Sequence, residues 1–140
     1  MEAAKVIKNG WVNLAKNIDF TEINKNKLLM DGAQYGWETS GIELLVKDLN
    51  ANLESVNVDG ETPLLLAAKN GHDKVVKRLI ALNSNVDARN KCNAIALHYA
   101  ASGNHEICVR ILIESGCSVN IKDNRGYTAL DKAMRNQLDN

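Results

Sequence analysis

Residues 61–87 read ETPLLLAAKNGHDKVVKRLIALNSNVD, and residues 94–120 read AIALHYAASGNHEICVRILIESGCSVN. The second stretch follows the first at an offset of 33 residues, and apolar and small residues coincide along both, beginning with Leu64 and Leu97. A further shift of 33 residues places Leu130 at the same position. A period of this length is typical of a repeat protein, in which each unit buries its apolar face by stacking on its neighbours.

Each copy is predicted to form two short helices. The first follows Thr62, whose hydroxyl can cap a helix, and has Pro63 at the first helical position, where the missing N–H of proline needs no partner. The second carries its apolar residues at helical spacing over residues 75–80. It ends at Asn83 in one copy and at Gly116 in the next, and these two residue types best tolerate a left-handed backbone.

The copies also share a short motif at the start of the first helix. It stands as TPLLLAA at residues 62–68, as IALHYAA at residues 95–101 and as TALDKAM at residues 128–134, so no copy keeps the whole of it. Together with the period, this motif resembles the T-P-L-H-x-A-A signature of the ankyrin-repeat family. The resemblance implies an all-α solenoid of stacked antiparallel helix pairs with short β-turn or hairpin-like loops. It also implies that His98 ties neighbouring loops together through hydrogen bonds.

The rest of the chain fits the same pattern, and we expect one domain. Its predicted parts are a degenerate N-terminal capping unit at about 1–20, repeats at 22–56, 57–89 and 90–122, and a half repeat or C-terminal cap at 123–140. Gly36 matches Gly71, but from Ile42 onward the offset returns to 33, with Val46 on Leu79. This change predicts two extra residues in the turn between the two helices of that repeat.

The last repeat shows no second helix before the sequence ends at Asn140. Either the array ends in a single helix, or this chain is cut from a longer one, and the sequence leaves both alternatives open.

Composition limits the class of protein. Lys+Arg and Asp+Glu both total 17, so the formal net charge is zero, and neither nucleic acid nor a membrane surface is an expected partner. No segment resembles a signal peptide, and none approaches the roughly 18 apolar residues of a membrane span. Three cysteines in different settings argue against a disulfide framework. We therefore expect an intracellular protein, cytoplasmic, nuclear or both.

No pattern in the sequence predicts catalysis, since G-x-S-x-G, a Walker-type loop and G-x-G-x-x-G are all absent. Cys92, His98, His105 and Cys108 could be imagined as zinc ligands, but their spacing forms no tight pair of pairs. Cys108 takes a core position and is expected to be buried, whereas Cys92 is the thiol expected at the surface. His72 and His105 open second helices and are expected to be structural. We expect no enzyme activity, no metal and no cofactor.

The resemblance further implies a groove that binds partner proteins, formed in this family by the loop tips and the exposed face of the first helices. The matching positions surround the glycine of each loop and follow the two alanines. They are Gln34, Tyr35, Val58, Asp59, Glu61, Lys69, Asn70, Lys91, Cys92, Ala94, Ser102, Asn124, Arg125, Tyr127 and Arg135, with Asn26 added from the second unit. Tyr35, Arg125 and Tyr127 are our first choices because Tyr and Arg often dominate interface energetics, and Lys69 and Lys91 would set the charge preference.

We therefore expect a non-enzymatic module that binds another protein as a scaffold, adaptor or inhibitor. A sharper version is an inhibitor or effector that masks a transcription factor or a host protein. The alternative is a regulatory ankyrin segment of a larger enzyme or channel. We expect a monomer unless the truncated last repeat is completed by another chain.

Overall fold

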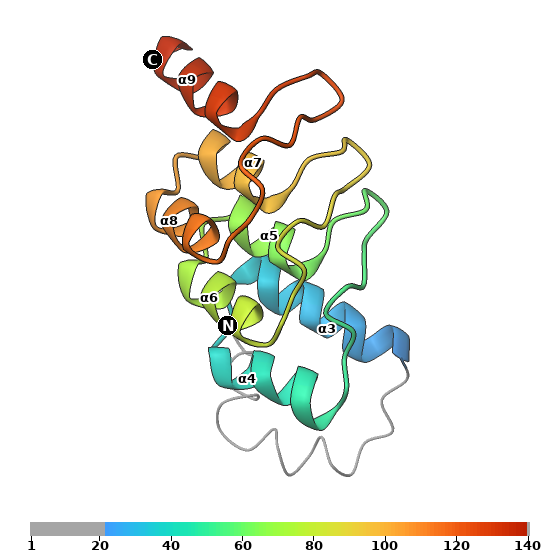
Figure 1. Cartoon of the computed structure of the whole chain (residues 1–140). Helices are drawn as coiled ribbons and strands as arrows, with labels where there is room; N and C mark the ends of the chain where they lie inside the picture. The colour runs from blue at the N-terminus through green and yellow to red at the C-terminus, as the bar shows by residue number, and fades with distance from the viewer. Residues whose placement is uncertain (1–21, 140) are drawn as a thin grey trace.

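The computed structural model describes residues 22–139, so the predicted capping unit at about 1–20 lies outside the described residues. The described helices form two layers along the molecule (Figure 1). The first layer contains α3 (Glu22–Tyr35), α5 (Pro63–Lys69), α7 (Ala96–Ser102) and α9 (Ala129–Asp139). The second layer contains α4 (Thr39–Glu43), which continues as the π-helical turn η1 (Leu44–Asp48), then α6 (Asp73–Ala81) and α8 (Glu106–Glu114).

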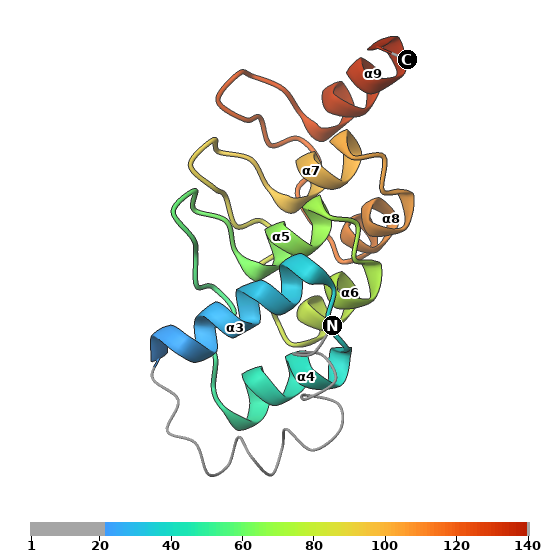
Figure 2. The ribbon, with the colours of Figure 1, turned by 180° about the vertical axis from the view of Figure 1, so that it is seen from behind.

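Each helix packs against its neighbours within a layer and across the layers. In the first layer α3 contacts α5, α5 contacts α7 and α7 contacts α9, while α4 contacts α6 and α6 contacts α8 in the second. The pairs α3–α4, α5–α6 and α7–α8 join the layers. The long loops that precede α5, α7 and α9 all extend to the same side (Figure 2). Residues 22–139 form no strand, and the predicted all-α solenoid of stacked helix pairs is confirmed.

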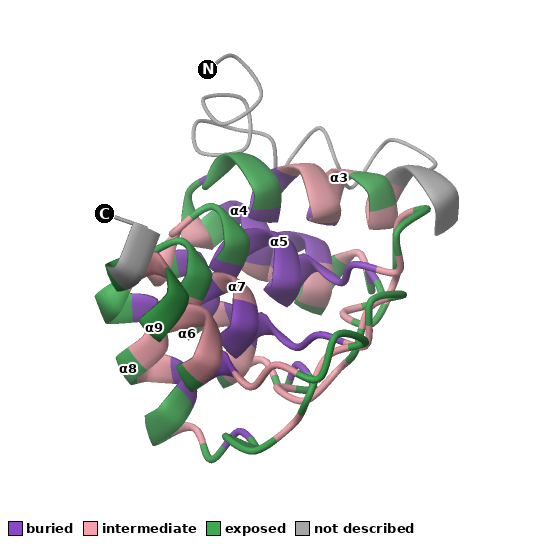
Figure 3. Cartoon of the chain, turned by 90° about the horizontal axis from the view of Figure 1, so that it is seen from above, coloured by how far each residue is buried: buried purple, intermediate pink, exposed green. Residues whose placement is uncertain are grey.

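The core lies between the two layers (Figure 3). Ala67 and Ala100 are fully buried on neighbouring first-layer helices, where a small side chain lets the helices approach closely. Leucines from the second-layer helices, such as Leu79 and Leu112, fill the space behind them. At the C-terminal end Met134 occupies the position of a repeat alanine and is 54% exposed, since no further repeat covers it among the described residues.

The predicted starts and ends of the helices are confirmed. The Leu65 N–H donates to Thr62 Oγ1 at 3.2 Å, with Pro63 at the first position of α5. Asn83 and Gly116, which follow α6 and α8, have φ angles of 76° and 88°. The longest described helix, α3, has 14 residues, and none within the described part is long and apolar enough to cross a bilayer, which takes about 20 residues.

The two extra residues of the second repeat do not both lie in the turn, as the sequence had suggested. From Gly36 to the first residue of the next helix, Thr39, the chain advances three positions, whereas from Gly71 to Asp73 it advances two. The turn therefore holds one extra residue, and the other must lie further along the helix.

The second extra residue lies in η1, and this corrects the predicted register of the helix. The Ala51 N–H donates to the Leu45 carbonyl at 2.8 Å, just as the Ser84 N–H donates to the Leu79 carbonyl at 3.0 Å. Leu45 is fully buried like Leu79, while Val46, which the sequence placed there, is half-buried. A π-helical turn accommodates one inserted residue without ending the helix, so the later residues return to the 33-residue period.

Candidate protein-binding groove

One polar side chain organises each of the loops that precede α5, α7 and α9. Asn57, Asn90 and Asp123 occupy equivalent positions, and the Oδ1 of each accepts hydrogen bonds of 2.9–3.0 Å from the N–H groups two and four residues later. The backbone N–H of each also donates to the carbonyl four residues later, at 2.9–3.1 Å. Short Asx side chains favour such turns because they substitute for backbone acceptors. The three loops therefore share one hairpin-like shape.

Neighbouring loop tips are joined to each other through the backbone. The Lys91 N–H donates to the Asp59 carbonyl at 3.1 Å, and the Asn124 N–H donates to the Cys92 carbonyl at 2.9 Å. The Asn124 side-chain amide adds a bond to the Lys91 carbonyl at 3.1 Å. These bonds set the spacing between the loops. The backbone of the tips is therefore fixed, and it determines where their side chains begin.

His98 links the fourth repeat to the loop of the fifth. Its Nδ1 accepts from the buried Ile95 N–H at 3.2 Å, so Nε2 carries the proton and donates to the Tyr127 carbonyl at 2.9 Å. The ring is buried and uses both nitrogens. The role implied by the family resemblance is confirmed.

His72 and His105 connect repeats at the opposite end of the first-layer helices. His72 Nε2 donates to the Gln34 carbonyl at 2.9 Å, and His105 Nε2 donates to the Lys69 carbonyl at 3.2 Å. Each acceptor lies near the end of the first helix of the preceding repeat, so these rings satisfy carbonyls that the helix itself leaves free. Their predicted structural role is confirmed.

Most of the predicted groove residues lie at the surface of the described part of the chain. Val58 is 82% exposed and Tyr35 is 56% exposed. The other exposed members are Gln34, Asp59, Lys69, Asn70, Lys91, Cys92, Ser102, Asn124, Arg125 and Arg135, and Tyr127 is half-buried. Asn26 is also half-buried, and its Oδ1 accepts from the Asn52 N–H at 2.7 Å, which gives it a structural task.

Glu61 and Ala94 are not at the surface, contrary to the prediction. Glu61 is 4% exposed because its carboxylate accepts from the Asn57 side-chain amide at 3.0 Å and from Lys69 Nζ at 3.1 Å. Ala94 is 3% exposed because it closes its loop, with its carbonyl accepting from the Asn90 N–H at 3.0 Å. Both residues shape the groove from beneath instead of presenting a side chain to a partner.

A pocket of about 220 Å³ opens between the last two loop tips and the first-layer helices α7 and α9. It brings together five of the predicted residues: Cys92, Ala94, Ser102, Asn124 and Arg125. Its other walls are His98, Tyr99, Asp123 and Lys132, which the groove prediction did not include. Gln34, Tyr35 and Val58 are not among the residues that line this pocket.

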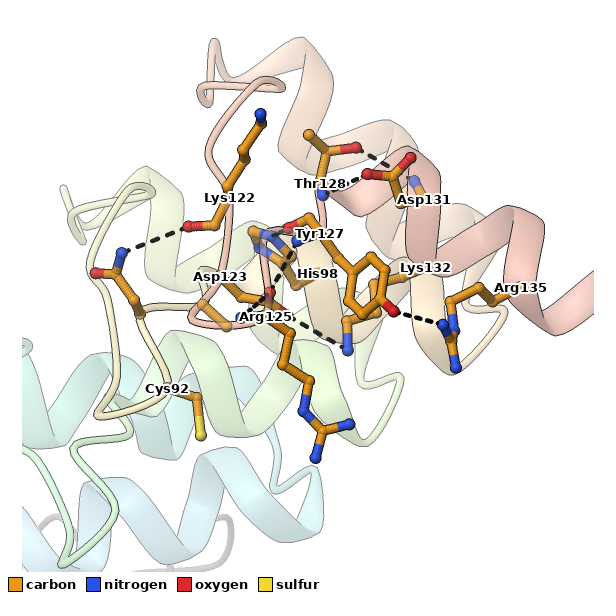
Figure 4. Close-up of polar contacts among 12 residues, drawn as sticks. Cys92, His98, Lys122, Asp123, Arg125, Tyr127, Thr128, Asp131, Lys132 and Arg135 are labelled. Carbon is orange, nitrogen blue, oxygen red and sulfur yellow. Dashed lines mark hydrogen bonds and ion pairs between the residues drawn. The ribbon is translucent and has the colours of Figure 1, made fainter.

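Tyr127 lies beside this pocket between two cations (Figure 4). Lys132 Nζ and the Arg135 guanidinium carbon are 5.4 Å and 4.8 Å from the ring centre, and Arg135 Nη1 donates to the Tyr127 hydroxyl at 2.7 Å. Lys132 Nζ is 3.4 Å from Asp123 Oδ2. Burial alone would raise the pKa of Asp123, but hydrogen bonds from two backbone N–H groups and from Lys132 outweigh it, and the pKa lies below its usual range. The carboxylate is therefore charged at neutral pH.

A similar arrangement surrounds Tyr99, one repeat earlier. Lys69 Nζ is 5.4 Å from the centre of the Tyr99 ring, and the hydroxyl accepts from the Asn90 side-chain amide at 2.5 Å. The hydrogen bond to Glu61 raises the pKa of Lys69 above its ordinary value. The rings of Tyr99 and Tyr127 are thus each covered by a lysine that also pairs with a carboxylate.

Tyr99, Asp123 and Lys132 are pocket residues that the sequence analysis missed, and a signal existed for two of them, Tyr99 and Lys132. These two occupy the same position of successive repeats and line the same pocket. The sequence held a signal for them: the equivalent residue of the third repeat is the apolar Leu66, whereas the next two repeats have Tyr99 and Lys132 there, both with a polar group. A position that changes from apolar to polar along an array indicates a side chain that reaches the surface.

The thiols and histidines of the described residues have environments that limit their reactivity. Burial, followed by the nearby charge of Asp73, raises the pKa of Cys108 to about 11, so the thiol stays neutral and unreactive. Cys92 is exposed, as predicted, and shares the pocket with His98, but both ring nitrogens of that histidine are engaged elsewhere. His98 therefore cannot act as a base toward Cys92. Within residues 22–139 no group of three His, Cys, Asp or Glu is placed to hold a metal ion.

Two named proteins are similar to this chain. One is the "Ankyrin repeat and KH domain-containing protein mask-1" of Caenorhabditis elegans, which is 31% identical over 107 residues, covering 76% of this chain and 4% of the relative. The other is the "Ankyrin repeat and KH domain-containing protein mask" of Drosophila melanogaster, 36% identical over 63 residues, covering 45% of this chain and 2% of the relative. The chain therefore spans a small fraction of the length of both relatives.

The family model described as "Ankyrin repeats (3 copies)" matches residues 1–90 and 71–140, so the two matches together extend over the whole sequence. This match agrees with the stacked helix pairs, the loop shape and the histidine bridges described above. The chain belongs to the ankyrin-repeat family.

Proposed function

We propose that this chain binds a partner protein through the groove between its loop tips and its first-layer helices, as a scaffold, adaptor or inhibitor. Ankyrin repeats are generally protein–protein interaction modules. The chemistry of the described residues supports binding in preference to catalysis, because the histidines are committed to backbone carbonyls and the buried thiol is neutral.

The observation that carries this proposal is a row of exposed side chains on loops of one fixed shape. Val58, Lys91 and Asn124 occupy the same position in successive loops, and hydrogen bonds join the last two pairs of neighbouring tips. Their side chains differ in chemistry while the loops beneath them keep one shape. A surface that is ordered before binding loses little conformational entropy when a partner docks, which favours affinity.

The test is site-specific photo-crosslinking in extracts of the cells that produce the protein. A benzophenone amino acid replaces Val58 at the loop tip in one variant and Lys77 on the second-layer helix α6 in the other. Both positions are exposed, and neither side chain makes a hydrogen bond or ion pair within the described part, so both variants should fold. We expect one defined protein to be crosslinked at position 58 and not at position 77.

If a defined protein is crosslinked from position 77 and none from position 58, the partner uses the second-layer face, and the groove assignment is overturned. Circular dichroism of both variants provides the control for folding, since the helical signal must match that of the unmodified chain.

A second candidate is that the chain regulates a larger polypeptide of which it forms part. The length of the relatives favours this, because the matched segment is 4% and 2% of their chains. Sequencing the full transcript tests it: an open reading frame that continues past Asn140 with a second helix for the last repeat would support it. A stop codon directly after Asn140 would count against it.

A further inference from the structure

Positive charge accumulates in the part of the groove formed by the last repeats. From the third repeat onward the cationic groove residues are Lys69, Lys91, Arg125, Lys132 and Arg135. The acidic ones are Asp59, Glu61 and Asp123. The chain as a whole has a formal net charge of zero, so this excess of two positive charges is a local feature of the groove.

Three of the five cations already have partners within the groove. Lys69 pairs with Glu61 at 3.1 Å, Lys132 pairs with Asp123 at 3.4 Å, and Arg135 donates to the Tyr127 hydroxyl. Arg125 and Lys91 make no ion pair in the described part of the chain, and both side chains are exposed. The backbone N–H of Arg125 is fixed to Asp123 Oδ1 at 2.9 Å, so the loop positions this residue while its guanidinium stays available.

The pocket beside Arg125 has the size of one side chain. Its volume of about 220 Å³ lies below the roughly 300–1,000 Å³ of pockets that hold whole small ligands. Tyr99 contributes an aromatic wall, and the Lys132–Asp123 pair closes one side. A guanidinium at the edge of such a pocket can bind a carboxylate through two parallel N–H···O bonds, which a lysine cannot do.

We propose that this cationic pocket, formed by Arg125, Lys132, Tyr99 and the neighbouring Lys91, binds an acidic segment of the partner protein, one Asp or Glu of which pairs with Arg125. This inference rests on the proposed function, because it assigns a chemistry to the partner that the groove binds. The long-range field of Lys91 and Arg135 would attract the remaining acidic residues of that segment.

Lys122 provides a matched control for Arg125. Both are exposed cations on the last loop, three positions apart. In Figure 4 the side chain of Lys122 extends away from the loop on the side opposite to that of Arg125. Lys122 takes part in the structure through its carbonyl, which accepts from the Asn93 side-chain amide at 3.4 Å, and this bond does not depend on the side chain. Reversal of either charge therefore changes the net charge equally and leaves the backbone bonds intact.

The experiment selects peptides from a displayed library of random, unphosphorylated 12-residue sequences on the immobilised full chain. We expect selected peptides to be enriched in Asp and Glu relative to the library. The best peptide should bind Arg125→Glu at least about tenfold more weakly and Lys122→Glu within about twofold of the unmodified chain, as measured by fluorescence polarisation. A peptide in which the essential acidic residue is changed to Lys should recover affinity for Arg125→Glu.

Other outcomes separate this inference from the proposed function. Selected peptides without acidic enrichment, or with equal loss for both variants, would overturn the pocket assignment and leave groove binding intact. A peptide that binds after phosphorylation of a serine, while its Asp and Glu versions do not, would replace the carboxylate with a phosphate and also overturn the assignment. Failure to select any peptide would overturn it too, and photo-crosslinking at position 58 would then decide the proposed function independently.

Discussion

Gly71 is the position at which the stacking of repeats can be tested most sharply by a single methyl group. Its φ angle is +74°, and a Cβ added there would lie 2.6 Å from Nδ1 and 2.7 Å from Cε1 of the His105 ring. Gly116 has a similar φ angle of +88°, but no atom lies within 4 Å of its added Cβ. Gly71→Ala and Gly116→Ala therefore share the cost of a left-handed backbone. They differ because only the alanine at position 71 would collide with a side chain of the next repeat.

The magnitudes follow from these two geometries. A left-handed conformation costs an alanine about 1–2 kcal/mol, so Gly116→Ala should lower the free energy of unfolding by about that amount. In Gly71→Ala the His105 ring must also move, and its 3.2 Å bond to the Lys69 carbonyl is lost, which adds about 0.5–1.5 kcal/mol. We therefore expect Gly71→Ala to be the more destabilised variant by about 1 kcal/mol.

Urea-induced unfolding followed by circular dichroism measures both variants, provided that the slope with denaturant stays unchanged. A double-mutant cycle with His105→Ala isolates the contact, because removing the ring should reduce the cost of Gly71→Ala to that of Gly116→Ala. Equal destabilisation of the two glycine variants, or a Gly71→Ala cost that is the same with and without the His105 ring, would refute the reasoning.

Three further predictions concern the bridges and the ionisable groups. His98→Leu keeps the volume of the side chain but leaves the buried Ile95 N–H, which donates to His98 Nδ1, without a partner. It also removes the bond to the Tyr127 carbonyl. We therefore expect the free energy of unfolding, measured in urea, to fall by about 2 kcal/mol and hydrogen exchange in the last loop to become faster. A maleimide at neutral pH should label Cys92 quickly in the native protein, while Cys108 and Cys117, whose pKa values are raised by burial, should react after unfolding, as counted by mass spectrometry. The lowered pKa of Asp123 means that its contribution to stability is present above its usual value of 3.8 and is lost as the pH falls through the native-state value. Asp123→Asn should therefore show a smaller loss of stability below about pH 4 than the unmodified chain.

The period of the sequence was sufficient to predict the fold. A 33-residue repeat with two helical patterns leaves each unit without a complete core, and stacking is the arrangement that buries both faces. The helix ends could also be predicted, because Thr62, Asn83 and Gly116 act through local backbone preferences that do not depend on the rest of the molecule.

Register within the second repeat could not be predicted by alignment alone. An inserted residue can lengthen a turn or form a π-helical turn, and the sequence around Leu45 and Val46 offers an apolar residue for either register. The choice is made by packing, since Leu45 fills the space that Leu79 and Leu112 fill in later repeats. The alignment therefore predicted the correct number of extra residues, two, but placed one of them in the turn when it lies in η1.

The groove was predicted as a set of sequence positions, and burial then divided that set. Glu61 and Ala94 lie two residues after the exposed Asp59 and Cys92, but the hairpin shape of the loop turns them inward. Lys132 was missed because family positions were transferred from the loop and the end of the helix, while the pocket also uses the N-terminal half of α9. Side-chain direction within a known loop is a tertiary property that position alone does not determine.

The loop tips combine two tasks that fall on adjacent residues. Asn57, Asn90 and Asp123 are chemically alike because each must accept two backbone N–H groups, whereas the residue that follows each of them is free to vary, as Val58, Lys91 and Asn124 show. Changing the first kind of residue should loosen the loop and change binding indirectly through the fold. Changing Val58 or Lys91, whose side chains make no hydrogen bond in the described part, alters the surface on an intact backbone. A change of Asn124 also removes the bond from its side-chain amide to the Lys91 carbonyl at 3.1 Å. A loss of binding therefore identifies a contact residue when it follows substitution of an exposed side chain without such a bond, as at Val58 and Lys91, and a binding map of this groove must be built from side chains of that kind.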